Sequence, residues 1–135
     1  MSDFSALMPD EIDCKDQIFD LAFHPKFDAL AVGLINGAVQ IYKYETDAKL
    51  ENKLMLTCDG EDAACRGVMF TDDGERLYSI SADKSIRSID GIGRVVLSIP
   101  HAHEDPVNKI IALSEGGSVF ATGMIINNVF FQIIK

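Results

Sequence analysis

Short apolar stretches alternate with polar turns along most of the chain. In IFDLAFHPKFDALAVGLINGAVQIYK (residues 18–43), three apolar stretches are separated by turns rich in Pro, Asp, Asn and Gly. Short runs between such turns are typical of strands in an antiparallel sheet. No apolar stretch holds the 3.6-residue spacing of a helix across several turns. The pattern therefore predicts an all-β fold.

The same pattern recurs after a constant shift of 47 residues. Under this shift Phe23 falls on Phe70 and Leu30 on Leu77, and a third copy begins at Val107. The stretches NKLMLT and GRVVLSI, which lie between the copies, are candidate fourth strands. A unit of four short strands that repeats every 42 to 47 residues is the signature of propeller blades. We therefore predict a partial β-propeller of about three four-stranded antiparallel blades.

The copies divide the chain into a lead-in, three blades and a tail. We place the lead-in at residues 1–15, the blades at about 16–57, 63–99 and 105–123, and an apolar tail at 124–135. Asn127-Asn128 suits a hairpin turn, which would make the tail the third strand of the last blade. Three blades are fewer than a closed propeller needs. An open arc leaves an apolar face of each end blade in water, so we expect self-association through these faces.

The repeat pattern breaks off after Gly123, where an uncharged segment begins. Two explanations compete for this break. The tail comes from a truncated or misspliced transcript, in which case the chain is a propeller fragment without independent function. Alternatively, the chain is a short isoform that pairs with itself or with another chain.

Composition describes an ordinary globular chain of one domain, with 135 residues of which 47% are hydrophobic and 24% charged. The net charge is −9, and the twelve Lys and Arg residues form no basic stripe. We therefore expect protein partners, basic ones in particular, and no direct binding of nucleic acid. No apolar run is long enough to span a membrane, and the acidic start does not read as a secretory signal. We expect neither membrane association nor secretion.

No cluster of reactive side chains stands out in the sequence. The three cysteines contain no C-x-x-C pair, so we expect reduced thiols rather than a metal site. Asp72 and Asp73 lack the further oxygen ligands of a calcium loop and predict a turn. His103 has no nucleophile or carboxylate at a catalytic spacing, and His24, which precedes a proline, is expected to face solvent. We predict no enzyme activity, no cofactor and no metal.

Three segments match parts of a known repeat: FHP at 23–25, SADKSIRSID at 81–90 and HAHEDPVNKI at 101–110. Blades of the WD-repeat family open with Gly-His, continue through a strand ending in Phe-Ser-Pro, and close on an Asp-centred turn and an Ile-Arg-Ile-Trp-Asp strand. From about Asp16 to Gly123 the chain resembles this family, and in motif order a branch linked to ribosomal RNA production. The resemblance implies a non-catalytic scaffold in ribosome biogenesis. It also implies protein or ribonucleoprotein partners and a location in the nucleus or nucleolus, with the cytoplasm as a further compartment.

Blades of this family often carry a buried network of His, Ser or Thr, Asp and Trp. Such a network stabilises a blade only when all its members are hydrogen-bonded. The chain has no Trp, and none of its copies holds the full set. We therefore expect stability to rest mainly on apolar packing. The corresponding positions hold Cys14, Val32, Asn36 and Tyr42 in the first copy; Glu61, Ser79, Asp83 and Ile89 in the second; and His103 and Thr122 in the third.

From this comparison we assign structural roles to Ser79, Asp83, His103 and Thr122, with His103 bonded to a strand hydroxyl such as that of Thr122. Partner contacts are expected in the loops at the start of each blade's first strand, because function in a rigid propeller resides in its loops. The candidate partner-binding residues there are Asp62, Arg66, Asp105 and Asn108.

Overall fold

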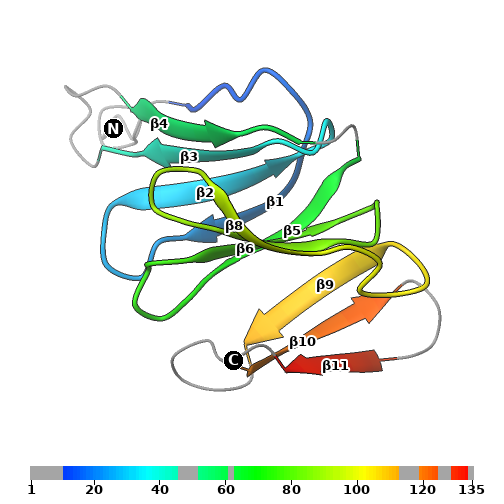
Figure 1. The fold of residues 1–135 in the computed structure, drawn as a ribbon. Helices are drawn as coiled ribbons and strands as arrows, with labels where there is room; N and C mark the ends of the chain where they lie inside the picture. The colour runs from blue at the N-terminus through cyan, green and yellow to red at the C-terminus, as the bar shows by residue number, and fades with distance from the viewer. Residues whose placement is uncertain (1–10, 46–51, 61–62, 113–118, 125–128, 134–135) are drawn as a thin grey trace, which may run out of the picture.

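A computed structural model of the chain describes residues 11–45, 52–60, 63–112, 119–124 and 129–133 (Figure 1). These residues contain eleven strands and no helix. The strands form three sheets, each a meander of antiparallel neighbours. The first sheet contains β1 (Ile18–Phe23), β2 (Ala29–Leu34), β3 (Val39–Lys43) and β4 (Lys53–Cys58). The second contains β5 (Cys65–Phe70), β6 (Leu77–Ser81), β7 (Ile86–Ile89) and β8 (Val95–Ile99).

The third sheet contains β9 (Val107–Ala112), β10 (Val119–Met124) and β11 (Val129–Ile133), in the order β11-β10-β9. The strand β11 lies within the apolar tail and pairs antiparallel with β10, from Val119 opposite Ile133 to Gly123 opposite Val129. The Asn127-Asn128 turn that the sequence suggests lies outside the described residues. The predicted all-β fold and its four-stranded antiparallel units are confirmed for the first and second sheets.

The 47-residue repeat is also a repeat of strand register. Phe23 lies opposite Leu30 in the first sheet, and Phe70 lies opposite Leu77 in the second. A bulge interrupts the β1–β2 pairing between Ile18 and Asp20, and another interrupts β5–β6 between Cys65 and Gly67. Because a one-residue slip would turn every side chain to the other face, these matched bulges keep the same positions pointing into the core.

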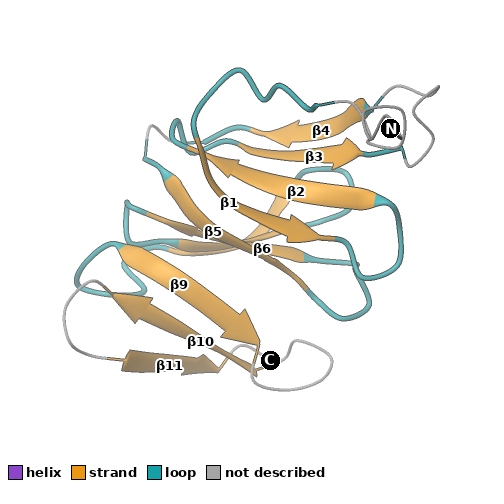
Figure 2. Cartoon of the chain, turned by 180° about the vertical axis from the view of Figure 1, so that it is seen from behind, coloured by secondary structure: helices purple, strands orange, loops and turns teal. Residues whose placement is uncertain are grey.

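The sheets are arranged face to face in chain order, with the second sheet in the middle (Figures 1 and 2). The main contacts between sheets run from β1 and β2 to β5, and from β5 and β6 to β9. The strands β4 and β8 are mostly exposed. The inner strands β1, β5 and β9 therefore converge while the outer strands diverge, as in the blades of a propeller.

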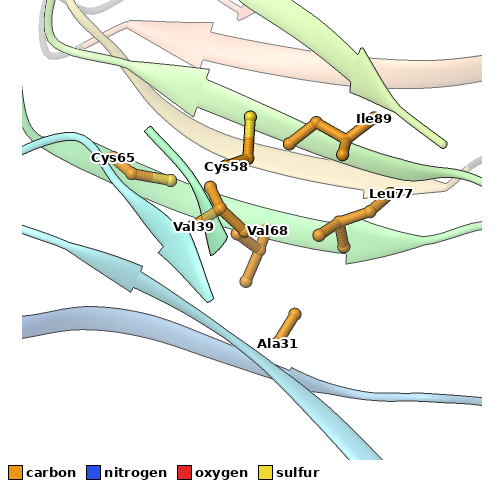
Figure 3. Close-up of a cluster of buried hydrophobic side chains, with 7 residues drawn as sticks. All are labelled: Ala31, Val39, Cys58, Cys65, Val68, Leu77 and Ile89. Atoms are coloured by element: carbon orange, nitrogen blue, oxygen red, sulfur yellow. The ribbon is translucent and has the colours of Figure 1, made fainter. Parts of the chain in front are cut away.

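Two apolar clusters fill the spaces between the sheets. The first cluster, between the first and second sheets, is drawn in Figure 3 and contains Ala31, Val39, Cys58, Cys65, Val68, Leu77 and Ile89. The second cluster joins the second sheet to the third and contains Tyr78, Ile80, Ile86, Val107 and Ile110. The second sheet is therefore covered on both faces.

A third cluster lies on the face of the first sheet that points away from the second. It contains Cys14, Val32, Leu34, Ala38 and Tyr42, with Ile12 and Leu30 packed against it. Because Cys14 and Ile12 precede β1, the lead-in covers part of the face that the sequence predicts to be open. Phe19, Leu21 and Phe23 on β1 stay exposed at 48%, 51% and 62%.

Candidate protein-interaction site

Two of the predicted partner-binding residues contact each other across two blades. Arg66 on β5 donates from its Nη1 to Oδ1 of Asn108 on β9, and both side chains are half-buried. The Nε atom of Arg66 is buried and has no hydrogen-bond partner among the described residues. Asp105 is half-buried just before β9, and Asp62 lies outside the described residues. Their role in binding partners remains a prediction.

A similar polar contact joins the first and second sheets. Asp20 on β1 accepts a hydrogen bond at Oδ2 from the backbone N–H of Val68 on β5, at 3.0 Å. Sequence reasoning did not single out this residue. The available signal was a lone carboxylate within the apolar stretch IFDLAF. Each sheet-to-sheet junction therefore has a half-buried polar contact between its inner strands.

Asp83 organises the turn between β6 and β7. Its Oδ1 accepts hydrogen bonds from the backbone N–H of Ser85, at 2.9 Å, and from the Ser85 hydroxyl, while its Oδ2 accepts from Arg87 Nη2 at 2.9 Å. Burial opposes ionisation of this carboxyl, but these hydrogen bonds, one from Ser81 and the charge of Arg87 outweigh it, so the pKa of Asp83 is lowered. Ser79 is buried on the adjacent strand β6.

His103 and Thr122 form a hydrogen bond in the third sheet, between Nε2 of the imidazole and Oγ1 of the hydroxyl. This is the pair that the sequence suggested. Both residues are buried, and burial lowers the pKa of His103 because it penalises the charged imidazolium. The bond joins the segment before β9 to the middle strand of the sheet.

The corresponding positions of the first sheet form no such polar pair, because Cys14 and Val32 lie there in the third cluster. Tyr42 caps this cluster and donates its hydroxyl proton to Oε1 of Gln40 at 2.6 Å. Burial, with the neighbouring Cys14 thiol, raises the pKa of Tyr42 to about 12. The first blade thus replaces the polar pair with apolar packing.

The prediction that His24 faces solvent is wrong. The ring is half-buried, and its centroid lies 4.9 Å from that of Phe70 in the second sheet. Its Nδ1 accepts from the backbone N–H groups of Lys26 and Phe27, each at 3.0 Å, so Nε2 carries the proton and donates to the Gly74 carbonyl at 3.2 Å. Gly74 has a φ of +74°, and a Cβ there would lie 2.3 Å from the imidazole Cε1. His24 therefore clamps the β1–β2 turn onto the β5–β6 turn.

A cavity of about 530 Å³ opens beside this clamp, between the first and second sheets. Its walls are apolar and its mouth is charged. It lies at the end of β5, whereas Arg66 and its partner Asn108 lie near the starts of their strands, so the sequence-predicted contacts are at the opposite end of the blades. The cavity is lined by His24, Phe27, Asp28, Ala29, Ile41, Lys43, Met55, Leu56, Phe70, Gly74, Glu75, Arg76, Leu77, Ile89, Asp90 and Gly91.

Reactive and metal-binding chemistry is scarce in the part of the chain that the structure describes. Its residues include no group of three or more His, Cys, Asp or Glu placed to hold a metal ion. The three cysteines are free and buried, and burial raises the pKa of Cys65 to about 12. Over the same described ranges, no helix has the length and apolar character required to cross a membrane.

Known proteins resemble the chain in sequence over most of its length. No protein-family model matches it. It is 36% identical over 116 residues to WD repeat-containing protein 55 of Danio rerio, 39% identical over 106 residues to that of Arabidopsis thaliana, and 38% identical over 116 residues to the homologue of Drosophila willistoni. These matches cover 85%, 78% and 85% of the chain. The chain belongs to the WD-repeat family.

Solved structures support the same architecture. The WD-repeat chain superposes on the β-propeller domain of Myceliophteria_thermophila Cps50 (Swd1) with a TM-score of 0.77, over 94% of its own length and 37% of that domain, at 16% identity. It superposes on Chaetomium thermophilum Sqt1, solved bound to the N-terminus of ribosomal protein L10, with a TM-score of 0.69, over 79% of its own length and 32% of that chain, at 20% identity. The predicted partial β-propeller is confirmed.

The chain spans a small part of each relative. It covers 29% of the Danio rerio protein, 30% of the Arabidopsis thaliana protein and 22% of the Drosophila willistoni protein. The Cps50 (Swd1) domain and Sqt1 are covered to 37% and 32% of their lengths. The WD-repeat chain therefore spans less than a third of the length of each of these curated relatives.

Proposed function

We propose that the chain acts as a non-catalytic scaffold in ribosomal RNA production, through contacts with proteins or ribonucleoprotein complexes. The observation that carries this proposal is the match to WD repeat-containing protein 55 in animals and a plant over most of the chain. The net charge of −9 supports basic protein partners over direct contact with nucleic acid. Sqt1, on which the chain superposes, was solved bound to the N-terminus of ribosomal protein L10, and this supports a protein segment as the partner.

The test is to deplete the protein in cells and measure the ratio of precursor to mature ribosomal RNA. We expect the precursors to accumulate and the ratio to return to normal when the protein is restored. A variant with Asp105→Lys should restore it poorly if the loops at the strand starts bind partners. The matched control is Asp72→Lys, which reverses an exposed charge in the β5–β6 turn, at the other end of the strands. An unchanged precursor ratio after depletion contradicts the proposal.

We place the protein in the nucleus and nucleolus, with the cytoplasm as a further compartment. A fluorescent fusion that never overlaps a nucleolar marker argues against this location.

A second candidate is a propeller fragment without independent function. The observation that favours it is the coverage of only 22% to 30% of the relatives' lengths. Long-read sequencing of the transcript across the codons for Gly123 to Lys135 separates the two. Reads that continue into further blades assign the scaffold role to the longer protein, whereas reads that stop after Lys135 support a functional short chain.

A further inference from the structure

We propose that the cavity between the first and second sheets binds an aromatic side chain of a partner peptide, with Lys or Arg residues on either side of it. This inference deepens the proposed scaffold function and rests on it, because it supplies a site and a ligand chemistry for one protein contact. Three features of the cavity lead to it: its apolar walls, its charged mouth and its fixed shape.

The walls of the cavity favour binding of an apolar side chain. Ile41 and Leu56 reach the cavity from the first sheet, and Phe70, Leu77 and Ile89 from the second. A volume of about 530 Å³ falls within the range of small-ligand sites, and it exceeds what one aliphatic side chain fills. The rings of His24 and Phe70 meet edge-on at the cavity, which offers an incoming ring the tilted contacts that aromatic pairs prefer.

The charges at the opening of the cavity favour Lys or Arg residues beside that side chain in the partner peptide. Asp28 and Glu75 are exposed there, and no ion pair with another described residue holds either carboxylate. Lys43 Nζ, by contrast, forms an ion pair with Glu45 Oε1 at 3.2 Å. Arg76 is therefore the one cation at the mouth that forms no ion pair with a described carboxylate. The carboxylates thus outweigh the available cation, in keeping with the net charge of −9 for the whole chain. A basic peptide segment complements this charge.

The cavity is shaped before any partner arrives. The His24 clamp fixes one side, between the β1–β2 and β5–β6 turns. On the other side, Asp90 accepts hydrogen bonds from the backbone N–H of Arg94 at 2.9 Å and from its Nε at 3.0 Å, which holds the β7–β8 turn. A preformed site loses less conformational freedom on binding than one that must be ordered by its ligand.

The absence of Trp from the chain provides a direct readout. The probe is the peptide acetyl-Gly-Lys-Trp-Lys-Gly-amide, titrated with the full 135-residue chain while the fluorescence of its indole is recorded. We expect a blue shift and saturable binding, because the indole moves from water into the cavity. The peptide with Glu in place of both Lys residues should have a dissociation constant about tenfold higher.

Two substitutions locate the binding. Gly91 lines the cavity, and a Cβ added to it meets nothing within 4 Å, so the backbone there has room for a side chain. We expect the ring of Gly91→Phe to obstruct the opening. It should weaken binding at least about tenfold. The matched control is Ile92→Phe, which changes the next residue of the same turn, exposed and outside the lining, and should leave binding unchanged.

A charge reversal keeps the test decisive if Gly91→Phe perturbs the turn. Glu75→Lys at the exposed mouth should weaken binding of the Lys peptide and not of the Glu peptide, whereas Glu104→Lys, exposed elsewhere, should change neither. Absence of binding overturns the proposal, as does equal binding to the chain with and without Gly91→Phe. Equal affinity for the two peptides overturns its electrostatic part. The precursor-RNA measurement tests the scaffold function separately, so either can fail alone.

Discussion

The first and second sheets are two copies of one repeat that are stabilised in different ways. The second sheet packs against a neighbour on each face, and its strand β6 is buried at every position. The first sheet has one neighbouring sheet, and the lead-in covers part of its other face through Cys14 and Ile12. The repeat therefore sets the strands and their register, while the position of a blade in the arc sets how much each residue contributes to stability.

The largest expected effect comes from the pair Leu30 and Leu77, which occupy equivalent positions 47 residues apart. Leu77 is 2% exposed in the first cluster, so Leu77→Ala should lower the free energy of unfolding by about 2–5 kcal/mol. Leu30 is half-buried, and Leu30→Ala should cost less than half of that. Urea denaturation followed by circular dichroism measures both. Equal losses in the free energy of unfolding would contradict the difference in packing between the two sheets.

The polar pair of the third sheet is expected to give the next largest effect. Thr122→Val removes the hydroxyl bonded to buried His103 and should lower the free energy of unfolding by about 1–3 kcal/mol. The double variant His103→Cys with Thr122→Val imitates the Cys14 and Val32 of the first sheet, and it should recover part of the loss. A double variant that is less stable than Thr122→Val by itself would contradict the idea that the two solutions are interchangeable.

The same histidine predicts a pH dependence. Because burial lowers the pKa of His103 in the folded state, the unfolded chain binds a proton first as the pH falls below about 6.5. The contribution of His103 to the free energy of unfolding should therefore be fully present above that pH. It should be lost as the pH falls through the folded-state pKa. The double variant should lose this part of the decrease. Denaturation curves between about pH 7.5 and 5.5, roughly one unit on either side of the ordinary histidine pKa, measure it.

A smaller effect is expected at the turns that follow the second strands of the first and second sheets. Asn36 Oδ1 accepts from Ala38 N–H at 2.9 Å, and Asp83, 47 residues later, accepts from Ser85 N–H at 2.9 Å. Asp83→Asn should keep this bond, lose the charged contact with Arg87 and cost about 1 kcal/mol at pH 7. Its folded-state pKa is lowered, so the wild-type contribution is present above the unfolded pKa and is lost as the pH falls through the folded one. The stability of Asp83→Asn should therefore depend less on pH below about 4, and an unaltered acid profile would contradict this.

The smallest effect on stability is expected at the uncovered part of the first sheet. Leu21→Lys changes an exposed side chain and should alter the free energy of unfolding by less than about 0.5 kcal/mol. It should nevertheless reduce self-association, measured by sedimentation velocity, because it places a charge within the exposed row of Phe19, Leu21 and Phe23. Val96→Lys on the exposed strand β8 is the control. If both variants associate equally, the first sheet is not the contact surface.

Sequence periodicity predicted much of the local structure, and it failed where a side chain reaches another blade. It predicted the strands and the turn at Asp83, and the family resemblance predicted the hydrogen bond between His103 and Thr122. Each of these features lies within a single repeat. It placed His24 in solvent, because a histidine before a proline in a polar turn carries no sign of a partner 50 residues away. The sequence predicts separate loop contacts for Arg66 and Asn108, although their side chains hydrogen-bond to each other over a separation of 42 residues.

By itself, the sequence determined the all-β class, the repeat and the register, because alternation and turn chemistry act between neighbours in the chain. The 47-residue shift carried this information from the first sheet to the second, bulges included. Only the tertiary structure decided which residues face each other between sheets: Asp20 with Val68, His24 with Gly74, and the walls of the cavity. Alternation specifies the face on which a side chain lies, but the residue opposite it depends on how two twisted sheets are rotated and spaced.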